Sequence, residues 1–151
     1  MQIGYLGLGA MGGALARRLS LSHKLVVCDL DESKVAAFEK LGAIRAASGA
    51  ELARTCDVIM MCLPRSSDVR SAIFGKGGVA EGCSPGKIVI DQTSGDPAET
   101  ADMARQLLSQ SVTMLDIPVS GGVRGADAGS IALMASGPRA ARQCACQPSL
   151  R

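Results

Sequence analysis

The sequence predicts an α/β domain in which a parallel, doubly wound sheet carries helices on both faces. Apolar runs of four to six residues alternate along the chain with segments of helical pattern, which is the order expected of βαβ units. The run DVIMMCL at 57–63 is apolar after its first residue, as a strand covered on both faces must be. A length of 151 residues suits one such domain.

The first half of the chain predicts four strands and four helices in alternation. The expected strands span 2–6, 24–28, 43–46 and 57–63, and the expected helices span 11–21, 31–41, 48–55 and 66–74. Gly42 follows the second helix, as is typical of a helix end, and Ser48 is a suitable N-cap for the third.

The second half continues the pattern after a glycine-rich loop at 75–86. A strand is expected at 87–91 and another at 113–117, with one more possible at 131–135. Between the first two, Asp96 at the N-cap, Pro97 at the first helical position and Glu99 two residues on predict a helix that runs to about residue 110.

Composition excludes several classes of protein. The 16 basic and 14 acidic residues are interleaved, which argues against nucleic-acid binding, and no apolar stretch is long enough to span a membrane. The N-terminus lacks the basic region of a signal peptide, and the six cysteines contain no C-x-x-C pair, so we expect reduced thiols and a cytoplasmic protein. His23 is the single histidine, which excludes a multi-histidine metal site; we expect it in a surface turn.

The first turn carries the motif G-L-G-A-M-G, with Gly7, Gly9 and Gly12 between a strand and a helix. In this context Gly7 permits the sharp turn, Gly9 lets the backbone approach a pyrophosphate, and Gly12 lets the helix lie close to the strand. The phosphates would lie against free N–H groups at the positive end of the helix. A plain tight turn is the alternative.

Asp29 ends the second expected strand, 22 positions after Gly7. A carboxylate there accepts hydrogen bonds from the adenosine ribose hydroxyls and repels a 2′-phosphate. Leu30 and Asp31 stand where an NADP-dependent protein usually offers an arginine, so the sequence favours NAD over NADP. A helix-capping role describes Asp31 better than Asp29.

Further candidate residues follow later strands, whose carboxyl ends face the ligand crevice in this architecture. Leu63 and Pro64 close the buried strand, and Thr93 and Ser94 follow the next one, where they also suit a helix-entry turn. Beyond Pro118, the small residues Ser120, Gly121 and Gly122 form a loop whose amides suit a carboxylate or phosphate. Arg124 suits either an anion clamp or a solvent-facing position.

Four segments together resemble the β-hydroxyacid dehydrogenase family, which includes 3-hydroxyisobutyrate dehydrogenase, tartronate semialdehyde reductase and 6-phosphogluconate dehydrogenase. They are IGYLGLGAMGGALARRL, DVIMMCLP, IVIDQTSGDP and LDIPVSGGVRGADAGSIALMASG, in the family's order. The resemblance implies a Rossmann-like NAD(P)-binding domain followed by an all-helical domain. It also implies reversible oxidation of a small 3-hydroxy acid.

The resemblance assigns roles to the same residues. The cofactor phosphates would contact Gly7, Leu8, Gly9, Ala10, Met11 and Gly12. Asp29 would hold the adenosine ribose, and Leu63 and Pro64 would line the nucleotide. Thr93 and Ser94 would lie near the nicotinamide ribose, although Thr93-Ser94-Gly95 departs from the commoner Ser-Thr-Ile pattern. Ser120, Gly121 and Gly122 would grip the substrate carboxylate.

The family's general base has no counterpart in these 151 residues. It is a lysine in a G-x-G-x-x-x-K segment of the later helical domain, and nothing after Gly137 matches it. We therefore expect a dinucleotide-binding domain at 1–137, an irregular tail at 138–151 and no catalytic residue in this chain; Lys76 lies in a remote loop. The alternative is a non-catalytic nucleotide-binding module or decayed fragment. Apolar surface left uncovered would favour a homo-oligomer.

Overall fold

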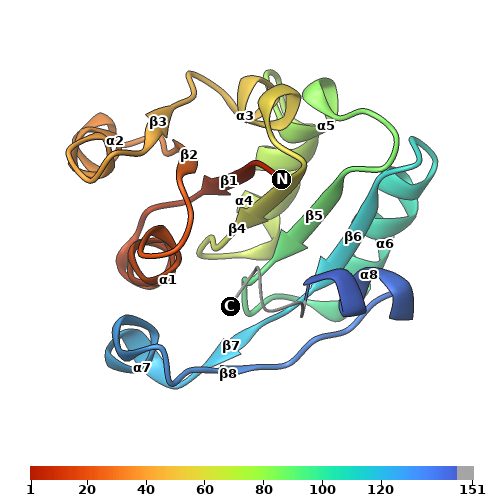
Figure 1. The fold of residues 1–151 in the computed structure, drawn as a ribbon. Helices are drawn as coiled ribbons and strands as arrows, with labels where there is room; N and C mark the ends of the chain where they lie inside the picture. The colour runs from red at the N-terminus through yellow and green to blue at the C-terminus, as the bar shows by residue number, and fades with distance from the viewer. Residues whose placement is uncertain (146–151) are drawn as a thin grey trace.

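The computed structural model describes residues 1–145 and contains a six-stranded parallel sheet with helices on both faces (Figure 1). The strands are β1 (Ile3–Leu6), β2 (Leu25–Cys28), β3 (Ile44–Arg45), β4 (Val58–Met61), β5 (Ile88–Asp91) and β6 (Thr113–Asp116). They pair in the order β3-β2-β1-β4-β5-β6. Successive strands are thus added on one side of β1 up to β3 and on the other side from β4 onward, so the direction of strand order reverses between β1 and β4. The predicted fold class is confirmed, and the reversal marks the carboxyl ends of β1 and β4 as the place where sheets of this kind bind ligands in a crevice. We call this edge of the sheet the crevice edge, or the crevice.

Two apolar layers hold the helices on the sheet. The helices are α1 (Ala10–Ser20), α2 (Glu32–Glu39), α3 (Gly49–Thr55), α4 (Ser66–Phe74), α5 (Val79–Gly82) and α6 (Pro97–Leu108). Tyr5 packs with Phe38 of α2 on one face, while Met61 packs with Val69 of α4 and Met103 of α6 on the other. The burial expected of β4 is confirmed, because Val58, Ile59 and Met61 are buried and Met60 is half-buried.

The predicted helix starts are confirmed in atomic detail. Asp31 accepts a hydrogen bond from the Ser33 N–H at 3.0 Å, and Ser48 accepts one from the Glu51 N–H at 3.1 Å. Asp96 accepts from the Ala98 N–H at 2.7 Å, directly before Pro97. These side chains satisfy backbone donors that a first helical turn leaves without partners.

The chain departs from the predicted elements in three places. The expected loop at 75–86 contains the short helix α5, because the buried Val79 anchors that turn beneath α3. The possible strand at 131–135 is reduced to β8 (Ala132–Leu133), which pairs antiparallel with β7 (Val119–Ser120) outside the main sheet. Helix α7 (Gly122–Ala128) connects these two strands.

The third departure is helix α8 (Arg139–Ala145), where composition predicted an irregular tail. Ala141 packs against the apolar cluster that contains Leu115 of β6, and this contact holds the helix against the sheet. The part of the predicted tail at 146–151 lies outside the described residues. No helix within 1–145 combines the length and apolarity that a membrane crossing needs.

Lys87 closes the C-terminal end of α3, and its loss is expected to destabilise the fold. Its ammonium donates to the carbonyls of Arg54 at 3.1 Å and Cys56 at 2.8 Å, and also to that of Ala53. Because these carbonyls carry the negative end of the helix dipole, Lys87→Met should lower the free energy of unfolding by about 2 kcal/mol in urea titrations. Lys76→Met, at an exposed lysine, should change it by less than about 0.5 kcal/mol. Equal losses in the two variants would contradict the assignment.

Candidate functional site

The turn between β1 and α1 is fixed by glycines at two positions. Gly7 has a φ of +91°, and a Cβ there would lie 2.6 Å from the Cys62 carbonyl oxygen. A Cβ on Gly12 would lie 2.1 Å from the carbonyl oxygen of Gly7, so the helix touches the turn backbone to backbone. The structure therefore requires glycine at both positions for its own packing.

Gly9 differs, because a Cβ there would meet no atom within 4 Å. It is the N-cap of α1 and makes no side-chain capping hydrogen bond, and the first turn of α1 contains no acidic residue. The positive end of an 11-residue helix thus faces open space beside a residue without a side chain. Such a cradle suits a diphosphate.

Asp29 lies at the carboxyl end of β2, beside this turn. Its carboxylate accepts hydrogen bonds from the Leu8 N–H at 2.5 Å and the Asp31 N–H at 2.8 Å, and its side chain is 12% exposed. The Lys34 ammonium is 3.9 Å from Asp29 and 3.4 Å from Asp31. The next residue, Leu30, is fully exposed. The Asp29 carboxylate is therefore a fixed hydrogen-bond acceptor in direct contact with the glycine-rich turn.

The carboxyl ends of the neighbouring strands β4 and β5 lead into two loops that carry predicted site residues. Leu63 and Pro64 follow β4, and Thr93 and Ser94 follow β5. The Thr93 side chain is buried, and its hydroxyl accepts a hydrogen bond from the Leu63 N–H at 3.0 Å. Ser94 and Pro64 are exposed. Of the two predicted hydroxyls, that of Ser94 is accessible to a ligand, while that of Thr93 joins the two loops.

The small-residue loop Ser120, Gly121 and Gly122 links β7 to α7. Gly121 and Gly122 have φ values of +138° and +68°, and both are exposed. Helix α7 packs against α1 (Figure 1). Arg17 of α1 and Asp127 of α7 form an ion pair at 3.0 Å. The helix that follows this loop is therefore held against α1, the helix that begins at the glycine-rich turn. Arg124 is exposed, in keeping with its solvent-facing interpretation.

The crevice edge also contains buried polar groups that the sequence did not single out. The Tyr5 hydroxyl donates to Gln92 Oε1 at 2.6 Å, and both side chains are buried. Burial raises the pKa of the nearby Cys62 thiol to about 11, so this cysteine is a neutral thiol at pH 7. A hydroxyl-bearing strand residue next to a buried amide leaves no periodic signal in a sequence, which is why this pair was missed.

Asp91 and Asp116 lie side by side at the ends of β5 and β6, where they are partners in the strand register. Asp91 accepts a hydrogen bond from the Thr93 N–H at 2.9 Å. Burial raises the pKa of both carboxyls above the ordinary aspartate value, and the charge of Asp116 raises that of Asp91 further. No group of His, Cys, Asp and Glu side chains in residues 1–145 is placed to hold a metal ion.

These raised pKa values predict how stability depends on pH. The folded state holds the Asp91 proton more tightly than the unfolded state, so the stability that this group contributes is present at low pH and is lost as the pH rises through the folded pKa. Asp91→Asn keeps an oxygen for the Thr93 N–H and removes the buried charge. We expect the variant to gain free energy of unfolding relative to the parent chain as the pH rises from 4 to 7, measured by urea titration.

Asp102→Asn is the matched control, because the Arg70 guanidinium lowers the pKa of the exposed Asp102 carboxyl. Its contribution has the opposite sign: the stability is present at neutral pH and disappears as the pH falls. A folded pKa below the ordinary aspartate value places most of this change below about pH 4, so the titrations of both variants extend down to about pH 2. The Asp102→Asn variant should lose stability relative to the parent chain as the pH rises through this acidic range. Difference curves of the same sign for the two variants would contradict the burial argument.

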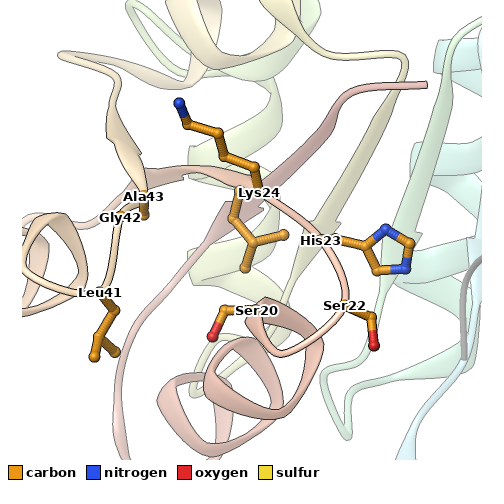
Figure 2. Close-up of a pocket in the computed structure, with 8 residues that line it drawn as sticks. Ser20, Ser22, His23, Lys24, Leu41, Gly42 and Ala43 are labelled. Atoms are coloured by element: carbon orange, nitrogen blue, oxygen red, sulfur yellow. The ribbon is translucent and has the colours of Figure 1, made fainter.

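A separate cavity of about 270 Å³ lies near the amino ends of β2 and β3, away from the crevice (Figure 2). It is lined by the end of α1, by the turn at Ser22, His23 and Lys24, and by the loop at 41–43. His23 occupies the predicted turn but is half-buried, and its Nε2 atom is buried without a hydrogen-bond partner among the described residues. None of the predicted site residues lines this cavity.

Comparison with known proteins identifies a family for this chain. The family described as the NAD binding domain of 6-phosphogluconate dehydrogenase matches residues 2–150. A probable mitochondrial 3-hydroxyisobutyrate dehydrogenase of Dictyostelium discoideum is 38% identical over 136 residues, which are 89% of this chain and 42% of that protein.

This chain is also similar to solved structures over nearly its whole length. A 3-hydroxyisobutyrate dehydrogenase from Salmonella typhimurium is 32% identical with a TM-score of 0.90, over 99% of this chain and 52% of the other. Psf3, solved with NADP+ and 2-OPP, is 29% identical with a TM-score of 0.90, over 95% of this chain and 51% of the other. The chain thus spans about half the length of these relatives.

Proposed function

Because this chain belongs to the family of NAD-binding domains of 6-phosphogluconate dehydrogenase, we propose that it is the dinucleotide-binding part of an oxidoreductase acting on a small 3-hydroxy acid. We further propose that it prefers NAD to NADP. The observation that carries both proposals is the open glycine cradle at the start of α1 with the Asp29 carboxylate fixed beside it.

The diphosphate would lie against the first turn of α1. Gly9 offers no side chain to obstruct it, and the N–H groups of Ala10 and Met11 stand at the uncapped helix end. Gly7 and Gly12 act indirectly, because they hold the turn in the shape that exposes these donors. An anion gains there from both hydrogen bonding and the helix dipole.

The ribose of adenosine would be held by Asp29. Its carboxylate accepts two backbone hydrogen bonds in the structure and retains acceptor capacity for the ribose hydroxyls. A 2′-phosphate would bring like charge against this carboxylate and that of Asp31. Lys34 is the nearest cation, but it is already paired with both aspartates, so it offsets this repulsion only in part.

The nicotinamide half would lie along Leu63, Pro64 and Ser94, with the hydroxy acid beyond it at Ser120, Gly121 and Gly122. Two consecutive glycines of positive φ turn their backbone toward solvent at the end of β7, and a substrate carboxylate would accept hydrogen bonds from that loop and from Ser120. Nicotinamide supplies a hydride acceptor when bound; the residues of this chain orient the two reactants.

We propose that the protein is cytoplasmic. Cys28, Cys56, Cys62 and Cys83 are free thiols, which suits the reducing cytoplasm. Leu133 and Met134 of the β8 segment are more than half exposed, and we propose that this apolar surface is covered by a second copy of the chain or by another domain.

Calorimetric titration with NAD and with NADP tests the cofactor proposal. The parent chain should bind NAD more tightly, by about tenfold or more, because a 2′-phosphate meets the unfavourable charge of Asp29. Asp29→Ala should weaken NAD binding and narrow the gap between the two nucleotides. Tighter binding of NADP by the parent chain would refute the assignment.

Asp57→Ala is a suitable control, because Asp57 is an exposed carboxylate at the amino end of β4, outside the crevice. It accepts the Gln2 N–H at 2.8 Å, so its loss also removes one backbone contact. The ratio of the two affinities should be unchanged in this variant. A ratio that moved equally in both variants would indicate an effect of net charge rather than of the ribose site.

A further inference from the structure

The loops that follow β4 and β5 are joined by two side-chain hydroxyls, one contributed by each loop. The Thr93 hydroxyl, in the loop after β5, accepts the Leu63 N–H at 3.0 Å. The Ser66 hydroxyl, at the start of α4, accepts the Asp96 N–H at 2.8 Å. We call Ser66 and Thr93, with these two bonds, the hydroxyl staple.

The hydroxyl staple continues the hydrogen-bond ladder of the sheet past the ends of the strands. The last backbone bond between the two segments runs from the Gln92 N–H to the Met61 carbonyl, at 2.8 Å. The direction of donation then alternates: the loop after β4 donates at Leu63, and the loop after β5 donates at Asp96. Two hydroxyls thus replace carbonyls where parallel strands diverge to form a crevice.

The absence of a side chain at Gly95 leaves room for the Ser66 hydroxyl. A Cβ on Gly95 would lie 2.5 Å from Ser66 Oγ, while the next nearest atom, Ser66 Cβ, would be 3.7 Å away. Any larger residue at position 95 would therefore displace the hydroxyl and break its bond to the Asp96 N–H. Thr93-Ser94-Gly95 has glycine where the Ser-Thr-Ile pattern has isoleucine, and this glycine leaves room for the Ser66 hydroxyl.

We infer that Ser66 and Gly95 are positioning residues for the nicotinamide half of the dinucleotide. This inference rests on the proposed function, which places that half along Leu63, Pro64 and Ser94. Pro64 and Ser94 each lie between the two bonds of the hydroxyl staple, and Leu63 donates one of these bonds, so the spacing of the loops sets the width available to a ligand. Neither Ser66 nor Gly95 is required to touch the cofactor.

The affinities of NAD and AMP for the full chain test the inference, since AMP contacts only the part of the site formed by the first turn and Asp29. Ser66→Ala should weaken NAD binding by about threefold to tenfold and leave AMP binding unchanged. Because the same bond is present without cofactor, the melting temperature should fall by about 2–4 °C, with the protein still folded. Ser66→Thr retains an Oγ atom and should keep the parent affinity.

The pair Ser66 and Gly95 gives a sharper test. Gly95→Ala should weaken NAD binding as much as Ser66→Ala does, because the new methyl displaces the hydroxyl. The double variant Ser66→Ala/Gly95→Ala should be no weaker than either single variant, since both changes remove the same bond. Additive losses would overturn the inference.

Amide hydrogen exchange without cofactor separates this inference from the proposed function. Ser66→Ala should accelerate exchange at the Asp96 amide and leave the Leu63 amide protected. If the parent chain binds no NAD, the proposed function fails and this inference falls with it. If the parent chain binds NAD and Ser66→Ala binds it equally well, or if AMP is weakened as much as NAD, the positioning role alone is overturned.

Discussion

Gly12→Ala is expected to destabilise the domain severely, whereas Gly9→Ala, three residues away, should leave it folded. The Cβ of the first variant would lie 2.1 Å from the Gly7 carbonyl oxygen, and both atoms belong to backbone held by the sheet and by α1. Relief requires α1 to move off β1. We expect a loss of about 2–3 kcal/mol, even after the gain in helix propensity from glycine to alanine of roughly 1 kcal/mol.

Gly9→Ala changes the ligand side of the same turn. Its Cβ would meet no protein atom within 4 Å, so urea unfolding should stay within about 1 kcal/mol of the parent chain. The methyl would occupy the space proposed for the diphosphate, and NAD affinity should fall by about tenfold or more. A Gly9→Ala variant that binds NAD normally would show that the phosphates lie elsewhere.

Local signals were sufficient to predict most of the elements. The N-cap aspartates at Asp31 and Asp96 and the proline after Asp96 define helix starts through bonds between near neighbours, and the structure contains those bonds. The glycine-rich turn was readable for the same reason, because its requirements arise within six residues and one neighbouring strand.

Tertiary contacts explain what the sequence did not reveal. Helix α5 lies in a glycine-rich stretch without helical periodicity, and a Cβ on Gly82 would be 1.9 Å from the Ala50 carbonyl oxygen, so packing against α3 decides its conformation. The pairing of β7 with β8 and the bond from Tyr5 to Gln92 join residues far apart in the chain. The hydroxyl staple likewise depends on Ser66 and Gly95, 29 positions apart, meeting in space.

A polypeptide of these 151 residues is expected to show no steady oxidation of 3-hydroxyisobutyrate with NAD, even when calorimetry shows that NAD is bound. The lysine that the family resemblance implies as general base has no counterpart in this sequence, and acid–base assistance of that kind is worth roughly 10²–10⁴-fold. Loss of substrate orientation adds to this. Nicotinamide absorbance at saturating NAD measures the rate.

Lys76 is the residue to test if turnover is nevertheless observed. It is exposed and lies after α4, in the connection to α5 and the amino end of β5, whereas the candidate site is built at the carboxyl ends of the strands. Lys76→Met should therefore bind NAD with the affinity of the parent chain and, like the parent chain, show no turnover. Steady turnover that disappears in Ser120→Ala would overturn the expectation, because it would show that the loop at Ser120 positions a substrate and that this chain supplies its own base. Retention of that turnover in Lys76→Met would then direct the search to side chains at the crevice itself, beginning with the Asp91 and Asp116 carboxyls.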